Sequence, residues 1–237
     1  MSQHTIAGTV LTMPVEVRKA EQHMAMFSVD ADAAQSLIDY SGLKVCRYRP
    51  GKAVVALMLM RYIDSDLGEY YEYGTNVMVN PPGTDATGLR ALQSAGAFIH
   101  HLPVDQEVTL EAWTKIWGYP KVMADFTIRD GHTYSFDVTI DGQFAVGMDF
   151  KPGLRVPAAF TSKPQEQPTY SYRDGVRRRT VGTMTMTGAR YRPGGATVRL
   201  GEHPYAKELA SLGFPKRAMV SGSAGNVAMS FADAQEV

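Results

Sequence analysis

The stretch from Val122 to Phe150 constrains the fold of this 237-residue chain more than any other segment. Between Tyr134 and Ile140, aromatic and aliphatic residues alternate with Ser, Asp and Thr. A period of two places one set of side chains on a buried face of a strand and the other on a polar face. Asp130-Gly131 and Asp141-Gly142 flank this segment and suit type I′ turns, which need positive φ at both central positions. The pattern predicts three antiparallel strands in a meander.

Other segments repeat the signals of strands and tight turns. The apolar runs Lys52–Tyr62 and Glu69–Val79 predict strands, and Asp174-Gly175 predicts another hairpin. Only two helices are clear, Asp30–Tyr40 with an Asp cap and His203–Leu212 with Pro204 in its first turn. Many strands with few helices predict an α+β, β-dominated fold whose antiparallel strands form a curved or closed sheet.

The length of the chain fits one β-barrel or sandwich, which can bury a full core without disulfides. Gly83–Ala95 is expected to be a surface loop or lid. Thr161–Pro168 is the best candidate for an internal crossing loop, but it is too short for a domain boundary. We therefore expect a single domain over residues 1–237.

Charge and cysteine content narrow the partners and the compartment. Lys plus Arg equals Asp plus Glu, 24 each, so the net charge is zero and gives no bulk attraction to nucleic acid or to a membrane. The run Arg177–Arg179 favours a solvated strand face or a subunit contact over a phosphate site. The single Cys46 cannot form an internal disulfide, and we find neither a signal peptide nor an apolar span. A cytoplasmic protein is expected, with no nucleic-acid or membrane partner.

The common catalytic and binding motifs are absent from the sequence. It has no GxGxxG, P-loop, HExxH or paired CxxC. His100 and His101 are adjacent, so on a strand they are expected to point to opposite faces, and we predict no metal site. Two segments stand out, Trp117–Lys121 and Gly68–Gly74. Taken alone, each is typical of ordinary surface: an exposed lysine after a turn and a solvated glutamate on a strand.

Together the two segments resemble the acetoacetate decarboxylase family. Trp-Gly-Tyr-Pro-Lys is similar to the Gly-(Phe/Tyr)-Pro-Lys segment that carries this family's Schiff-base lysine, and Gly-x-Tyr-x-Glu-x-Gly is similar to the segment that carries its catalytic glutamate. Phe98–Lys121 matches the family without a gap, and Arg199–Ala218 also resembles it. The resemblance implies a closed or cone-like barrel around a central cavity, with Lys121 as the imine-forming lysine and Glu72 as the carboxylate.

The residues around these two fit such a site. On a strand, Glu72 shares its face with Tyr70, while Trp117 and Tyr119 are placed to desolvate a neighbouring amine. We therefore expect Tyr70, Trp117 and Tyr119 to contact the substrate. The resemblance further implies that the chain needs no organic cofactor, because the lysine itself accepts electrons, and that it forms a homo-oligomer. The 13 methionines and zero net charge are compatible with self-association.

Three positions depart from the family's pattern. Val122 stands where the decarboxylases have a second lysine, and Leu57 where they have a second carboxylate. Arg18 is the nearest candidate for the family's substrate-binding arginine, although its position fits an exposed strand end equally well. A lysine attacks a carbonyl only when its amine is neutral, so its pKa must be lowered from the usual value of ~10.4. In acetoacetate decarboxylase a neighbouring cation lowers the pKa of the reactive lysine. We expect Val122 to add apolar surface instead, so that desolvation lowers the lysine's pKa.

These observations leave three interpretations open. The leading one is a lyase that forms an imine between Lys121 and a small-molecule keto acid, followed by decarboxylation or by aldolase or dehydratase chemistry. The second is a non-catalytic protein on the same fold that binds a carboxylate or another small molecule, with Lys121 pairing the bound carboxylate. The third is an unrelated barrel in which the motifs occur by chance.

Overall fold

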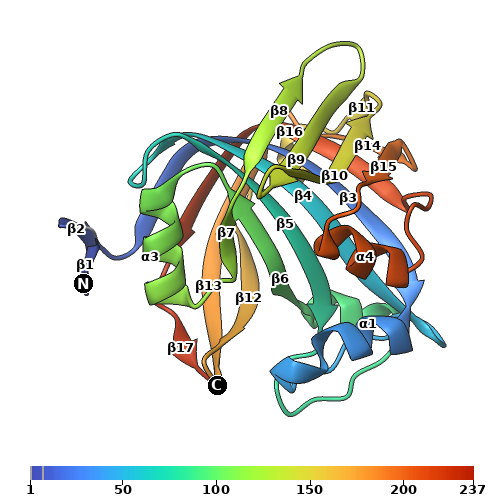
Figure 1. Ribbon diagram of the computed structural model, residues 1–237, viewed down its shortest axis with the longest axis horizontal. Helices are drawn as coiled ribbons and strands as arrows, with labels where there is room; N and C mark the ends of the chain where they lie inside the picture. Colours follow the sequence, from blue (N-terminus) through green and yellow to red (C-terminus); the bar gives the residue numbers. More distant parts are fainter. Residues whose placement is uncertain (1, 7) are drawn as a thin grey trace.

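A closed barrel of seven strands forms the centre of the molecule (Figure 1). The computed structural model describes residues 2–6 and 8–237. Around the barrel the order is β16-β3-β4-β5-β6-β12-β13, and pairing between β13 and β16 closes it. All neighbours are antiparallel except β6 and β12, which run parallel. Their bounds are β3 Val15–Asp30, β4 Lys52–Ser65, β5 Tyr70–Val79, β6 Gly96–Val104, β12 Gln165–Arg173, β13 Val176–Thr187 and β16 Val220–Phe231.

A second sheet of four strands, ordered β15-β10-β9-β8, packs beside the barrel (Figure 1). Its strands are β8 Asp125–Arg129, β9 Tyr134–Ile140, β10 Gln143–Phe150 and β15 Ala196–Leu200. The remaining strands are β1 Gln3–Ile6, β2 Thr9–Thr12, β7 Lys121–Met123, β11 Leu154–Arg155, β14 Arg190–Pro193 and β17 Gln235–Glu236. The helices are α1 Ala31–Ile38, α2 Leu89–Ser94, α3 Glu107–Trp117 and α4 Pro204–Ser211, with 3-10 turns at Asp39–Ser41 and Ala158–Phe160. The predicted β-dominated closed barrel is thus confirmed. Separately, no helix in the described part of the chain is long and apolar enough to cross a bilayer.

The predicted meander is β8-β9-β10, and one of its turns differs from the prediction. Asp141 and Gly142 have φ of 50° and 72°, as a two-residue type I′ turn requires. Asp130 and Gly131 do not have positive φ. There the strands stop at Arg129 and Tyr134, so His132 and Thr133 lengthen the connection to four residues and remove the need for a tight turn.

Helix ends follow the expected chemistry. The Asp30 carboxylate accepts from the backbone N–H groups of Asp32 and Ala33 at 3.0 and 3.1 Å and caps α1. His203 caps α4 by accepting from Tyr205 N at 3.2 Å. Two loop predictions were too broad: 83–95 contains the short helix α2, and the last residues of 161–168 already belong to β12. Helix α3 was missed.

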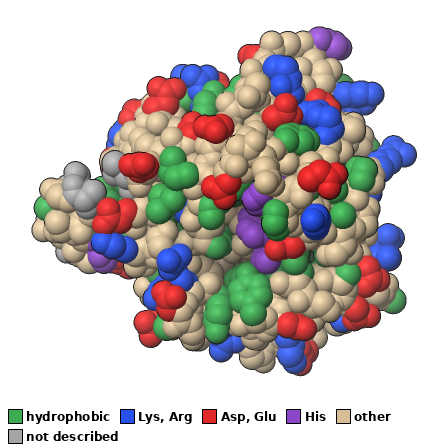
Figure 2. Space-filling view, viewed as in Figure 1, with side chains coloured by type: hydrophobic (Ala, Val, Ile, Leu, Met, Phe, Trp, Pro, Cys, Tyr) green, Lys and Arg blue, Asp and Glu red, His purple; other side chains and the backbone are tan. Residues whose placement is uncertain are grey.

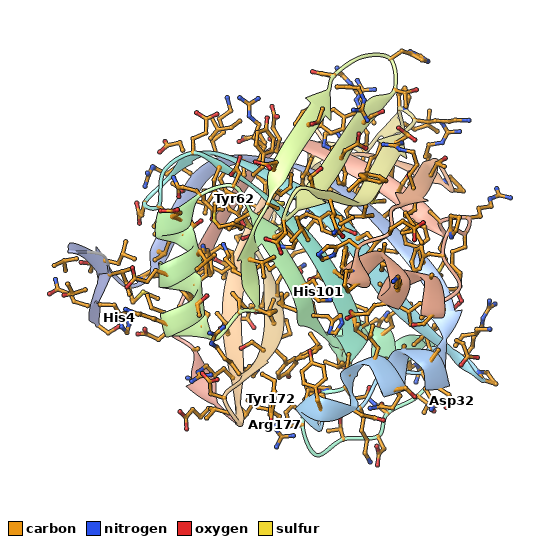
Figure 3. All side chains as sticks on the ribbon, in the orientation of Figure 1. His4, Asp32, Tyr62, His101, Tyr172 and Arg177 are labelled. Atoms are coloured by element: carbon orange, nitrogen blue, oxygen red, sulfur yellow. The ribbon has the colours of Figure 1, made fainter. Side chains whose placement is uncertain are left out.

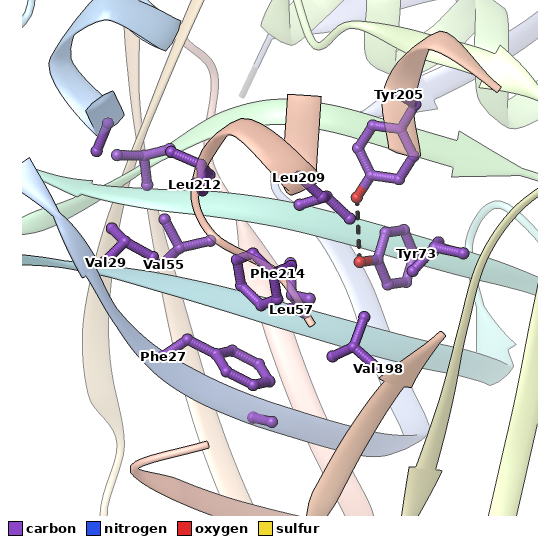
Figure 4. Close-up of a cluster of buried hydrophobic side chains, with 14 of the residues drawn as sticks. Phe27, Val29, Val55, Leu57, Tyr73, Val198, Tyr205, Leu209, Leu212 and Phe214 are labelled. Atoms are coloured by element: carbon purple, nitrogen blue, oxygen red, sulfur yellow. Dashed lines mark hydrogen bonds between the residues drawn. The ribbon is translucent and has the colours of Figure 1, made fainter. Parts of the chain in front are cut away.

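The alternation of β4 divides the buried residues into two clusters. Leu57 and Leu59 face the cluster between the barrel and the second sheet, whereas Met60 and Tyr62 face the barrel interior. Figure 4 shows part of the first cluster, where Leu57 lies among aromatic and aliphatic side chains. Within it, Tyr205 OH on α4 donates to Tyr73 OH at 3.0 Å, which joins the helix to β5. The second cluster, which includes Met60 and Tyr62, fills the interior of the barrel instead.

Replacing Phe136 with alanine is expected to lower the free energy of unfolding by about 3–5 kcal/mol. Phe136 is fully buried on β9, and its ring centroid lies 5.7 Å from that of Tyr73, so it fastens the second sheet to the barrel. Urea unfolding measures the change. Phe160 is 73% exposed, so Phe160→Ala is a matched control expected to change stability by less than about 0.5 kcal/mol. Equal effects of the two substitutions would contradict the packing described here.

Candidate active site

A cavity of about 110 Å³ lies inside the barrel. Every barrel strand contributes to its wall, and α3 closes one side with Trp113. The wall is mostly apolar, with methionines from three different strands and a few neutral amides and hydroxyls. Its lining residues are Gln22, Met58, Met60, Tyr62, Glu72, Asn76, Ile99, Leu102, Trp113, Tyr119, Gln167, Thr169, Gly182, Thr183, Met184, Met229 and Phe231.

Of the two residues singled out by the sequence motifs, Glu72 lines this cavity, and Lys121 contacts Glu72 without being part of the wall. Lys121 Nζ lies 2.7 Å from Glu72 Oε2, and their side chains are 0% and 7% exposed. Tyr62 OH donates to the other carboxylate oxygen, Oε1, at 2.9 Å. Among the described residues, neither Nζ nor Oε2 has a further hydrogen-bond partner. The amine is therefore a buried group held by one carboxylate.

Local structure directs Lys121 inward. Helix α3 ends at Trp117, and Gly118 adopts φ of 66° with its N–H bonded to Thr114 O at 3.1 Å. Positive φ is easily reached by glycine and lets the chain reverse. The chain then enters β7, which pairs in parallel with β6 so that Lys121 lies opposite Leu102. Lys121 starts the strand on its buried side, and the next two residues are exposed.

Aromatic rings surround the amine. Nζ lies 5.2 Å from the centroid of the Tyr70 ring and 5.0 Å from that of Trp113. Trp113 Nε1 donates to Tyr70 OH at 3.2 Å, and Tyr62 stacks on Tyr70 with centroids 4.1 Å apart. Figure 3 labels Tyr62 at the end of the barrel where α3 packs. The rings exclude water from the ion pair, and their faces attract a cation.

Burial and the carboxylate act in opposite directions on the basicity of Lys121. Burial lowers the pKa of Lys121 to about 8, although the neighbouring Glu72 carboxylate raises it. At pH 7 about a tenth of the amine is then neutral, far more than for a free lysine with a pKa of ~10.4. Burial also raises the pKa of Tyr62 and of Tyr70 well above 10, so both phenols stay protonated. The site thus holds a partly neutral amine, a carboxylate and a neutral hydrogen-bond donor in apolar surroundings.

The three aromatic residues predicted to contact substrate take different places. Tyr119 lines the cavity, and its hydroxyl lies 2.6 Å from Thr169 Oγ1. Tyr70 stands over the amine without lining the cavity. Trp117 is not in the wall either: it packs on Trp113 with centroids 4.1 Å apart and donates to Ala232 O at 2.8 Å.

Arg18 and Leu57 lie away from the cavity. Arg18 is half exposed and pairs with Asp64 at 2.7 Å and Asp66 at 2.6 Å on the surface. Leu57 points into the cluster between barrel and sheet, because residues on a strand alternate and an offset of one residue changes the face. The residues of β3 and β4 that do face the cavity include Gln22 and Met58, and Gln22 Nε2 lies 2.9 Å from Met58 Sδ. No arginine lines the cavity in the described part of the chain.

The expected role of Val122 was wrong. Its side chain is 41% exposed, so it adds no apolar surface around the amine, and Tyr70 and Trp113 provide the desolvation instead. Sequence reasoning missed Trp113 and Tyr62. The spacing of Trp113 and Trp117, four residues apart, is that of one helix face and was an available signal.

Among the described residues, one group of side chains is arranged so that it could hold a metal, and it lies outside this cavity. His100, His101 and Glu208 come together beside α4. The expectation that His100 and His101 point to opposite faces was wrong, because both imidazoles contact the same carboxylate oxygen of Glu208.

Comparison with known proteins agrees with the fold. The family model described as acetoacetate decarboxylase matches residues 5–234. The acetoacetate decarboxylase of Legionella pneumophila superposes with a TM-score of 0.69 at 17% identity, covering 99% of this chain and 89% of the other. The enduracididine biosynthesis enzyme MppR, solved with pyruvate, gives 0.63 at 14%, covering 97% and 92%. An acetoacetate decarboxylase-like enzyme from Sphingomonas wittichii gives 0.60 at 12%, covering 96% and 94%. Comparison with curated proteins finds no match.

Proposed function

This chain belongs to the acetoacetate decarboxylase family, and on that premise we propose that it is a lyase that forms an imine between Lys121 and a small keto acid. The observation that carries the proposal is the buried pair of Lys121 Nζ and Glu72 Oε2, which lie 2.7 Å apart, with Glu72 lining the cavity. A fully buried lysine is rare in proteins and costs free energy, so a functional role accounts for it better than a structural one.

The chemistry follows from the positions of the two groups. The neutral amine adds to the keto carbon of the substrate, and the resulting carbinolamine loses water to give a protonated imine. Glu72 is close enough to the nitrogen to accept its proton during addition and to return it to the leaving hydroxide. Tyr62, which donates to Glu72, holds the carboxylate in place. No organic cofactor enters this scheme, because the imine itself withdraws electrons from the substrate.

Two reactions can follow from the same imine. A β-keto acid would release carbon dioxide, and the electrons of the broken C–C bond would move to the iminium nitrogen. A 2-oxo acid would instead form an enamine by proton loss and enter aldol or dehydration chemistry. The cavity of about 110 Å³ with methionine walls fits a small substrate with an apolar substituent. Neutral amides such as Gln22 and Asn76, which line it, are the groups available to hold a carboxylate.

Reductive trapping tests the proposal. Borohydride added to the protein with pyruvate or acetoacetate is expected to fix an adduct, seen as added mass on a peptide containing Lys121. Lys121→Ala is expected to abolish the adduct. Lys115→Ala is the matched control, since Lys115 is largely exposed on α3 and is expected to leave the yield unchanged. An adduct that survives Lys121→Ala would contradict the assignment of the nucleophile.

The rate of trapping is expected to rise with pH through about 8. The amine reacts when neutral, and its lowered pKa of about 8 sets where the neutral fraction increases. The initial rate of adduct formation between pH 6 and 10, at fixed borohydride, measures this dependence. A midpoint near 10.4, the value of a free lysine, would show that burial does not activate the residue.

A non-catalytic, carboxylate-binding protein on the same fold is the second candidate. It is favoured by the contact with Glu72, which stabilises the ammonium form of Lys121 and so opposes nucleophilic attack. The same trapping experiment separates the two functions. Tight binding of keto acids without any adduct would favour the binding protein.

A further inference from the structure

Two imidazoles and one carboxylate converge on the outer side of β6. Glu208 Oε2 on α4 lies 2.9 Å from His100 Nε2 and 2.7 Å from His101 Nε2. The three candidate ligand atoms all lie within 4.8 Å of one another. Figure 2 shows histidine side chains gathered near the centre of one face, and Figure 3 places His101 beside α4. None of these three residues lines the cavity inside the barrel.

A bulge in β6 explains how neighbouring histidines reach one point. His101 pairs with Thr75 of β5, but the next pair is Ile99 with Asn76, so His100 is an extra residue on its strand. A bulge places an additional residue opposite one partner residue and redirects its side chain. Both imidazoles can therefore turn toward α4, which regular alternation would prevent.

The spacing of these atoms fits a coordination shell. With bonds of about 2.0–2.1 Å, the ligands of a tetrahedral Zn²⁺ are about 3.3 Å apart. The separations of 2.9 and 2.7 Å between Glu208 Oε2 and the two imidazole nitrogens would therefore need to widen by only about half an ångström. Two imidazoles and a carboxylate suit borderline divalent ions of the first transition row. His100 Nδ1 lies 3.0 Å from Tyr40 OH, the kind of outer contact that fixes the ring of a metal-bound histidine.

We propose that His100, His101 and Glu208 bind one divalent transition-metal ion, best suited to Zn²⁺, with at least one coordination position left for water. The ion replaces the Nε2 protons of the two imidazoles and ties α4 to β6. Helix α4 also carries Tyr205, whose hydroxyl donates a hydrogen bond to Tyr73 OH within the core. An ion held between α4 and β6 would therefore add to the contacts that pack this helix on the barrel.

The competing explanation is a metal-free hydrogen-bond cluster, in which both imidazoles donate a hydrogen bond to the Glu208 carboxylate. His101→Gln separates the two, because the glutamine amide keeps an N–H donor for the carboxylate but is a poor ligand for Zn²⁺. Glu208→Gln removes the anionic ligand. His132→Gln is the matched control, since His132 is exposed in the loop between β8 and β9.

Isothermal titration of the chelator-treated full chain with Zn²⁺ tests the proposal. We expect one ion per chain, with the affinity weakened at least about 100-fold by His101→Gln and by Glu208→Gln and unchanged by His132→Gln. Circular dichroism checks that each variant is folded. No binding to the unmodified chain, wild-type affinity in folded His101→Gln, or loss of binding in His132→Gln would overturn the proposal.

Cobalt provides a measurement that needs no variant. Co²⁺ added to the unmodified chain is expected to give the intense visible absorption of four- or five-coordinate cobalt with nitrogen ligands, and Zn²⁺ is expected to displace it. The weak spectrum of octahedral, mostly hydrated cobalt would count against the site.

Discussion

Lys121→Met is expected to abolish both imine trapping and turnover and to lower the free energy of unfolding by about 3–5 kcal/mol. Methionine retains apolar bulk in contact with the rings of Tyr70 and Trp113 but has no nucleophile. The loss of stability arises because Glu72 stays buried without its cation, with Tyr62 as its remaining hydrogen-bond donor. Mass spectrometry after borohydride treatment and urea unfolding measure the two effects.

A double variant separates chemistry from stability. Lys121→Met combined with Glu72→Gln removes the unpaired charge, so part of the lost stability is expected to return while trapping and turnover stay absent. Recovery of activity in the double variant would show that the reaction does not pass through the lysine.

Glu72→Gln is expected to preserve trapping at pH 7 and to lower turnover about 10²–10⁴-fold. The Glu72 carboxylate raises the pKa of Lys121, so its removal shifts that pKa below about 8 and increases the neutral fraction at pH 7. Imine formation therefore keeps its nucleophile, whereas proton transfer to and from the substrate loses its carboxylate. The yield of the trapped adduct and the rate of product formation from pyruvate or acetoacetate, each measured for the unmodified chain and for Glu72→Gln, give the comparison.

The exposed neighbour Glu69 supplies the control for this prediction. Its carboxylate pairs with Arg61 at 3.2 Å on the surface, and Glu69→Gln is expected to leave both trapping and turnover unchanged. Equal turnover in Glu72→Gln and the unmodified chain would remove Glu72 from the mechanism. We expect the unmodified chain to turn over acetoacetate poorly, because it lacks the second lysine and the second carboxylate of the family. Rapid decarboxylation of acetoacetate would show that these two groups are dispensable.

The local parts of the fold were predictable because their signals are local. The alternation from Tyr134 to Ile140 and the Asp141-Gly142 turn specify a hairpin without reference to the rest of the chain. The closure of the barrel depends instead on pairs such as Val15 with Phe231, which no short-range pattern encodes. The bulge at His100 is a register shift between two strands, so alternation along one strand could not reveal it.

Site residues that belong to a sequence motif were predictable, whereas those whose direction depends on the packing of strands and helices were not. The resemblance indicated Lys121 and Glu72, and the structure brings their charged atoms together. It could not indicate Trp113, because the helix that carries Trp113 was not recognised. It also could not indicate that Gln22 on β3 points inward, because no motif covers that position. An error of a single residue on a strand exchanges a cavity position for an outer one, as Leu57 and Met58 show.

Closure of the barrel by β16 has a consequence for when the pKa of Lys121 is lowered. This strand supplies Met229 and Phe231 to the cavity wall, and it pairs with the β3 strand from the other end of the chain. Contacts so distant in sequence form late, after most of the polypeptide has been made. Until then water reaches Lys121, and its amine is as basic and as protonated as any surface lysine. On the proposed function, Lys121 therefore gains its lowered pKa, and with it its reactivity toward keto acids, only when the fold is complete.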